Sequence, residues 1–222
     1  PSVLGLFNSI GLILGYAPFL QIGISNGLNR ELPYYIGKGE PKRAGELAAA
    51  AQAWIILAGS VAAIALLIVA LYHLIQGNFL MAAGWGTHAV LVFLMYYSTY
   101  YLQITYRTAH DFVRLSKINV IQASVSLALL VLVWMLEFYG LCLRAVLTAI
   151  IAAALFYFWR PVRVGPRWDF YHLEHLFVIG APIFVVGQIY AWWDVINQTL
   201  VLSYTGTHEW GFTLWLLSHP RL

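Results

Sequence analysis

Five stretches without a single Asp, Glu, Lys or Arg constrain this chain more than any other feature of its sequence. They cover residues 1–29, 47–106, 118–136, 145–159 and 175–193. A helix needs about 20 apolar residues to cross the hydrocarbon core of a bilayer. Most of these stretches approach or exceed that length, and 47–106 is long enough for two crossings, with a glycine-rich break near Gly77 to Gly86. We therefore expect a polytopic membrane protein.

The composition excludes the main alternatives. Hydrophobic residues make up 61% of the chain and charged residues only 9%, whereas a soluble domain carries roughly a quarter charged residues. Disorder requires the opposite composition. A net charge of +3 from twelve basic residues offers no basic face for a nucleic acid. Cys142 is the one cysteine, so no intrachain disulfide can form.

The expected fold is all-α, a transmembrane helix bundle of about six complete spans. We place these spans at about 3–27, 47–72, 84–106, 118–136, 139–159 and 176–203. Residues 1–203 would thus form the bundle, and 204–222 a short outer loop and the start of another span. Because an apolar pattern is interrupted at both ends, we expect an internal piece of a longer membrane protein.

The basic residues predict an orientation. Ten of the twelve lie in the alternate loops 28–46, 107–117 and 160–175. The loops between them contain no Lys or Arg. Short basic loops stay in the cytoplasm, so we expect a multi-pass protein of the cytoplasmic (inner) membrane whose first span runs from outside to inside.

The strongest candidate for function inside a span is Asp194. It is the only acidic residue deep in an expected span and shares a helical face with Tyr190, Asn197 and Gln198. An intramembrane carboxylate is costly and is often functional. These four residues either line a substrate pathway or form a structural cluster of hydrogen bonds.

Arg144 lies about one turn inside the outer end of the expected span 139–159. One interpretation is structural, with the side chain reaching the outer surface or pairing with Glu137. The other is a cation that faces a cavity and binds a phosphorylated or acidic cargo, for which arginine is well suited.

Further pathway candidates lie near the inner side of the membrane. Tyr97 and Tyr101 belong to a tyrosine-rich part of the span 84–106, which forms either an interfacial belt or a vestibule that stacks on sugar rings. Gln21, Asn26 and Arg30 lie at the inner end of the first span, where they either line the mouth of a pathway or simply end the helix.

Signatures of catalysis are missing from the sequence. It has no P-loop, no G-x-S-x-G motif and no paired carboxylates within the spans. His172 and His175 are three residues apart without an evident third metal ligand. We therefore expect neither an enzyme nor a metal or cofactor site.

Two passages resemble a known family. The first begins with GLF at 5–7, reads GISNGLNRELP at 23–33 and continues as GKGE at 37–40. The second reads WRPVR at 159–163 and continues as IGAPIF at 179–184. Together they are similar to the bacterial oligosaccharide and polysaccharide flippases, including O-antigen flippases, of the multidrug/oligosaccharidyl-lipid/polysaccharide exporter superfamily. On this resemblance the first span corresponds to the second helix of the family and the sixth span to its seventh.

The resemblance implies a function. Members have two similar lobes and move lipid-diphosphate-linked glycans across the cytoplasmic membrane by alternating access, and this chain would form about one lobe. Its partners would be the bilayer, the glycan lipid and possible glycan-assembly proteins. One alternative is a multidrug or organic-cation exporter of the same superfamily. Another is a membrane-embedded polysaccharide polymerase or glycosyltransferase, which the short outer loops disfavour.

Overall fold

The structure, a computed structural model, describes the backbone of residues 2–218. Side chains are described in this range except at 2, 190–192, 194, 201, 202 and 204–218. The elements are α1 (Ser2–Gly11), α2 (Ile13–Tyr16), the 3₁₀ helix η1 (Ala17–Gln21), α3 (Ile24–Gly37), α4 (Pro41–Ile75), α5 (Phe79–Tyr97), the π-helix η2 (Ser98–Leu102), α6 (Gln103–Thr108), α7 (Phe112–Ala128), α8 (Leu130–Phe158) and α9 (Phe170–Ser218). Every element of the described backbone is helical, which confirms the expected all-α fold.

Five helical segments of the described residues are long and apolar enough to cross a membrane. They are Val3–Gln21, Pro41–Ile75, Phe79–Thr108, Leu130–Phe158 and Phe170–Ile189. Large apolar side chains are exposed along the bundle, including Trp134 at 85% and Ile75 at 79%. Such an apolar surface is unfavourable in water but favourable in contact with the hydrocarbon chains of lipids. The expectation of a polytopic helix bundle is therefore confirmed.

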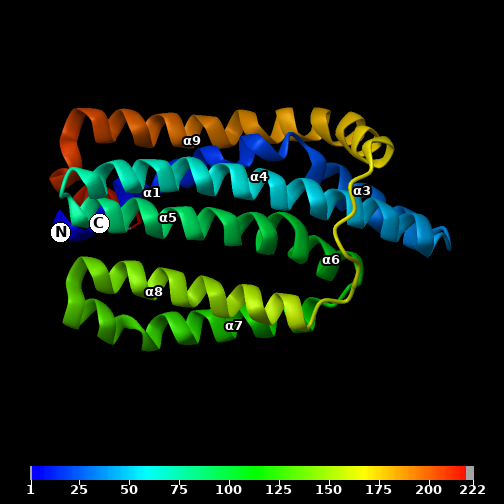
Figure 1. The fold of residues 1–222 in the computed structure, drawn as a ribbon, viewed down its shortest axis with the longest axis horizontal. Helices are drawn as coiled ribbons and strands as arrows, with labels where there is room; N and C mark the ends of the chain where they lie inside the picture. Colours follow the sequence, from blue (N-terminus) through cyan, green and yellow to red (C-terminus); the bar gives the residue numbers. More distant parts are fainter. Residues whose placement is uncertain (1, 219–222) are drawn as a thin grey trace.

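The fourth expected span, 118–136, differs from the expectation because its helix is interrupted. α7 has 17 residues and ends at Ala128, and its C-cap residue Leu129 has a ψ of 0°. The following residues are assigned to α8 up to Glu137, where φ is 47° and ψ is −112° and the chain reverses. Gly140 lies directly against the backbone of Leu132 across this turn. α7 and α8 consequently form an antiparallel pair along one side of the bundle (Figure 1).

The first expected span, 3–27, is not one continuous helix in the structure. It consists of α1, α2 and η1, and α3 begins only after Ile22 and Gly23, whose φ angles are 46° and 87°. Pro18 lies in η1 and has no backbone N–H to donate. Glycine accepts a positive φ without strain. This break separates the membrane-crossing segment from α3.

α3 and α9 cross at glycines. A Cβ atom on Gly27 would collide with the backbone of Leu176, and one on Gly180 would collide with the backbone of Gly23. Small residues allow helices in a membrane to approach this closely. Gly23 and Gly27 belong to the first family-like passage and Gly180 to the second, so passages far apart in sequence pack against each other.

The core lies between α3, α4, α5 and α9. α4 contributes small alanines, several of them fully buried, such as Ala48, Ala50 and Ala51. Gly59 on the same helix lies against Tyr96 of α5. Figure 1 shows α4 and α5 side by side in the middle of the bundle, with α9 and α1 on one side and the α7–α8 pair on the other.

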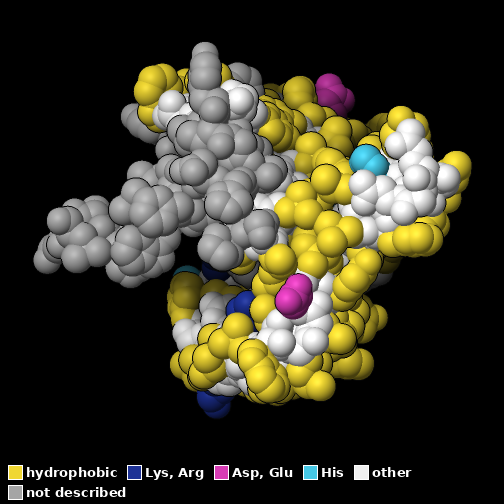
Figure 2. Space-filling view, turned by 90° about the vertical axis from the view of Figure 1, so that its left-hand side faces the viewer, with side chains coloured by type: hydrophobic (Ala, Val, Ile, Leu, Met, Phe, Trp, Pro, Cys, Tyr) yellow, Lys and Arg dark blue, Asp and Glu magenta, His cyan; other side chains and the backbone are white. Residues whose placement is uncertain are grey.

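The two ends of the bundle differ in charge. The three basic segments follow α3, α6 and α8, and all three lie at the same end (Figure 1). At the opposite end, Figure 2 shows mostly hydrophobic and uncharged side chains on the described surface. The fold therefore separates the basic loops from the other loops, as the expected topology requires.

Candidate functional site

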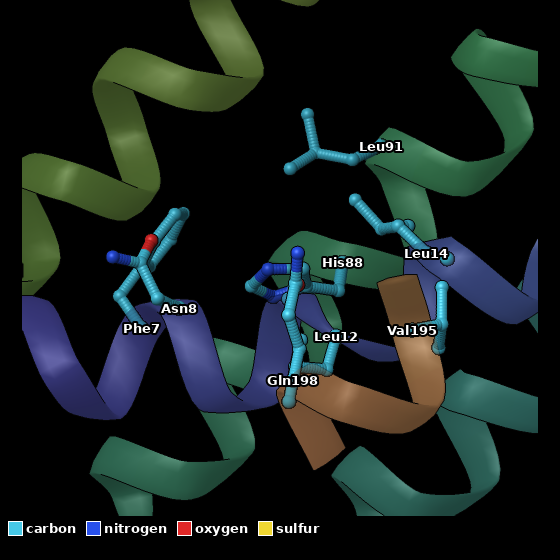
Figure 3. A pocket seen from close by; sticks show the side chains of 10 residues that line it. Phe7, Asn8, Leu12, Leu14, His88, Leu91, Val195 and Gln198 are labelled. Atoms are coloured by element: carbon cyan, nitrogen blue, oxygen red, sulfur yellow. The ribbon is translucent and has the colours of Figure 1, made fainter. Parts of the chain in front are cut away.

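Two adjoining cavities form a cleft between α1, α5, α7, α8 and α9. Their volumes are about 400 and 330 Å³. Phe7 and Leu91 line both cavities, so the two spaces share a wall. Figure 3 shows side chains from three parts of the chain around the first cavity. We call the two cavities together the cleft.

Three polar side chains on three different helices line the first cavity. Asn8 comes from α1, His88 from α5 and Gln198 from α9. His88 is only 1% exposed, and its Nδ1 lies 2.8 Å from the carbonyl oxygen of Gly84. A carbonyl only accepts, so Nδ1 carries a proton and Nε2 of the neutral ring is the acceptor. The first cavity therefore presents donors and acceptors within an apolar bundle.

Small residues allow α1 to approach His88 closely. A Cβ atom on Gly11 would lie 3.2 Å from His88 Nε2. The ring of Phe7, one turn earlier, has its centroid 4.9 Å from that of His88. The imidazole is thus held between the helix to which it belongs and α1.

Arg144 of α8 lines the second cavity. Its Nε donates to the carbonyl oxygen of Ser126 at 3.0 Å and its Nη2 to Ser126 Oγ at 2.7 Å. Pairing with Glu137, one of the structural alternatives, is not found among the described residues. Arg144 instead holds the α7–α8 pair together and remains half-buried on the cleft wall.

No described lining residue of the cleft supplies a counter-charge to Arg144. The other polar side chains of the second cavity are Gln122, Ser126 and Thr148, and Thr148 Oγ1 is buried without a hydrogen-bond partner. No Asp or Glu is present among the described lining residues of either cavity. The described walls therefore favour an anion over a cation.

The expected stripe around Asp194 is only partly described. Gln198 lines the cleft, whereas Asn197 is exposed on α9. The side chains of Tyr190 and Asp194 lie outside the described residues. The expected outer loop at 204–209 also falls where side chains are not described, within α9.

Tyr97 and Tyr101 lie apart from the cleft, in a cluster with Gln52 of α4. Gln52 Nε2 donates to the Tyr97 hydroxyl at 3.1 Å, and the Tyr101 hydroxyl lies 3.4 Å from Gln52 Oε1. The two tyrosine rings are stacked with centroids 5.9 Å apart. Neither tyrosine lines the cavities that hold Arg144 and Gln198.

The candidates at the end of the first span are also separate from the cleft. Gln21 is 4% exposed, and its Oε1 has no hydrogen-bond partner. Asn26 is half-buried and Arg30 is exposed. Arg30 Nε lies 4.0 Å from Glu31 Oε1. The ten candidates predicted from sequence therefore do not form one site.

Sequence reasoning missed Asn8, His88 and Gln122 in the cleft. All three are polar residues within charge-free stretches. The rule that singled out Asp194, namely that a polar group inside a span requires a reason, applies to them as well. Within the described part of the chain, no group of three or more His, Cys, Asp or Glu residues could hold a metal ion.

Comparisons with known proteins add no relative. No family model, no curated protein and no solved structure matches this chain.

Proposed function

We propose that the chain belongs to a membrane transporter that flips lipid-linked oligosaccharide or polysaccharide precursors across the cytoplasmic membrane by alternating access. The observation that carries this proposal is the half-buried Arg144 in a cleft whose described lining contains no carboxylate. Arginine is well suited to bind the phosphate oxygens of a diphosphate carrier. Asn8, Gln122 and Gln198 add amide groups that could bind sugar hydroxyls.

The interrupted first span supports a moving pathway. α1 and α2 line the first cavity, and the positive φ angles at Ile22 and Gly23 separate them from α3. Hinges in membrane transporters use such short interruptions, where a few residues absorb the change in backbone angles. On this proposal the basic loops lie in the cytoplasm, and the cargo reaches the cleft from that side.

The alternative within the same superfamily is an exporter of organic cations. Such a cleft would place an acid near the cargo, and Asp194 is the residue that could supply it. The described lining residues place Arg144 there instead, so the lipid-linked glycan is the better-supported cargo.

Binding assays on the full chain in nanodiscs distinguish these cargoes. One probe is a polyprenyl-diphosphate disaccharide, and the other is the lipophilic cation tetraphenylphosphonium. We expect the diphosphate probe to bind and the cation not to compete. Arg144→Gln should weaken diphosphate binding about tenfold, which corresponds to about 1.4 kcal/mol.

The matched control is Ser126→Ala, which removes the side-chain partner of Arg144 but leaves the charge in place. It should change the affinity much less than Arg144→Gln. Tight binding of the cation probe, or diphosphate binding that is insensitive to Arg144→Gln, would refute the proposal.

A further inference from the structure

A second cationic group lies outside the cleft, at the end of the bundle that carries the basic loops. Arg160 is the second residue after Phe158, the last residue of α8 and of its membrane-crossing segment. Its guanidinium carbon lies 3.8 Å from the centroid of the Tyr157 ring. This cation–π contact holds the half-buried side chain beside the bundle.

Two nitrogens of the Arg160 guanidinium group lack hydrogen-bond partners. Nε and Nη1 are both buried and neither makes a hydrogen bond. No carboxylate of the described residues lies within ion-pair distance of it. A buried donor without an acceptor costs free energy, and an anion that accepts from these two nitrogens would relieve that cost.

A hydroxyl group next to Arg160 has the matching chemistry. The hydroxyl belongs to Tyr97, whose ring centroid lies 6.4 Å from that of Tyr157, the ring that the Arg160 guanidinium covers. That hydroxyl accepts a hydrogen bond from Gln52, so its own proton remains free to be donated. Arg160 and Tyr97 therefore offer several donors and a positive charge in one place.

The backbone around this cluster is unusual. Tyr97 precedes, and Tyr101 lies within, the π-helical segment η2. Such turns are rare in helices and are frequent at functional sites. The Tyr101 hydroxyl contacts Gln52, which ties the π-helical turn to the residue that orients Tyr97.

We propose that Arg160 and Tyr97 bind a lipid-borne phosphate in the leaflet at this end of the bundle. The position of Arg160 just beyond a membrane-crossing segment matches the depth at which lipid phosphates lie. Arginine binds phosphate oxygens through charge-assisted hydrogen bonds. This site shares no residue with the cleft, so it stands independently of the proposed function.

Native mass spectrometry of the full chain in detergent tests the proposal. The probe is dioctanoyl phosphatidylglycerol, and dioctanoylglycerol, which lacks the phosphate, is the comparison lipid. We expect the phosphatidylglycerol to bind and the glycerol lipid to bind at least tenfold more weakly. Arg160→Gln should reduce phosphatidylglycerol affinity about tenfold, or about 1.4 kcal/mol.

Arg163→Gln is the matched control, because Arg163 is an exposed basic residue of the same loop. It removes the same charge and should change the affinity less than twofold. Arg160→Lys should give an intermediate loss, since it keeps the charge but loses the planar donors. This variant also serves as the test if Arg160→Gln does not yield folded protein.

Three results would overturn the proposal. Equal losses for Arg160→Gln and Arg163→Gln would show that the loop attracts lipid only through its net charge. Equal binding of the two lipids would show that no phosphate is recognised. Displacement of the lipid by inorganic phosphate at equal concentration would identify a site for free phosphate rather than for a lipid.

Discussion

His175 Nε2 lies 3.0 Å from Glu31 Oε2, and this contact joins α9 to α3. The Glu31 side chain is only 9% exposed, whereas that of His175 is 32% exposed. A buried carboxylate requires a hydrogen-bonding partner. Glu31 belongs to the first family-like passage, and His175 lies one residue before Leu176, which packs on Gly27. The contact thus lies beside the glycine crossing of the same two helices.

We predict that Glu31→Ala destabilises the bundle by about 1–3 kcal/mol, because it removes the partner of His175 and a buried hydrogen bond. Unfolding by SDS in mixed micelles measures the free energy. The control is Glu40→Ala, since Glu40 pairs with Lys38 at 2.9 Å where both side chains are exposed. An ion pair this exposed contributes little to stability, so Glu40→Ala should change the free energy of unfolding much less than Glu31→Ala. Equal losses for the two variants would contradict a special role for Glu31.

The glycine crossing predicts a sharp difference between two substitutions in α9. Gly180→Ala would force a Cβ atom into the backbone of Gly23, whereas a Cβ atom on Gly187 has no neighbour within 4 Å. We expect Gly180→Ala to reduce the yield of folded, monodisperse protein severely. Gly187→Ala should be neutral or slightly stabilising, since alanine favours helix. Size-exclusion chromatography in detergent compares them, and similar yields would contradict the close crossing.

Much of the fold follows from the sequence because a bilayer imposes simple rules. The stretches without charge predicted the helical segments, and the basic residues predicted which loops share an end. The break at Ile22 and Gly23 was not predicted as a break, because Pro18 alone does not specify where a helix stops. The interruption at Leu129 has no sequence signal that we can identify.

The candidate site was less predictable, because it depends on which helices become neighbours. Arg144 was identified as a charge within an expected span and Gln198 as a neighbour of Asp194 on one helical face, and both line the cleft. Tyr97 and Tyr101 were identified from the tyrosine-rich part of the span 84–106, but they pack on Gln52 instead. His88 was missed because a single histidine in a long apolar stretch gives no spacing pattern. Its role depends on the approach of α1, which only tertiary structure reveals.

The hydrogen bonds of Asp169, at the start of α9, predict that the stability of the fold depends on pH. Its Oδ1 accepts from the backbone N–H groups of Tyr171 and His172, and its Oδ2 lies 2.9 Å from His172 Nδ1. The hydrogen bond from the His172 side chain, followed by the one from its backbone, lowers the pKa of the Asp169 carboxyl below 3.8. Folding therefore gains stability above pH 3.8, and this gain is lost as the pH falls through the lower folded-state pKa.

The test compares the wild-type chain with Asp169→Asn between pH 3 and pH 6. Asparagine still caps the helix but carries no charge. We expect the wild-type chain to be the more stable of the two near pH 6 and the difference to shrink below about pH 3.8. A difference that is constant over this range would contradict the charged contact with His172.

The arrangement of the loops predicts at which positions an introduced cysteine is accessible from outside the cell. Lys42 and Arg163 lie at the end of the bundle with the basic loops, and Gln76 lies at the other end of α4. All three positions are exposed. In a Cys142→Ser background, an impermeant maleimide should label cysteine at position 76 in intact cells. Positions 42 and 163 should react only after permeabilisation, because positively charged loops stay in the cytoplasm.

The pair of inner positions makes this experiment a test of both fold and orientation. If positions 42 and 163 both react in intact cells while position 76 does not, the fold is right and the orientation is inverted. If positions 42 and 163 differ from each other, they cannot lie at the same end. That result would contradict the arrangement of the loops, which puts the segments after α3 and α8 at the same end. Reaction at position 76 alone fits both the helical arrangement and the retention of the basic loops in the cytoplasm.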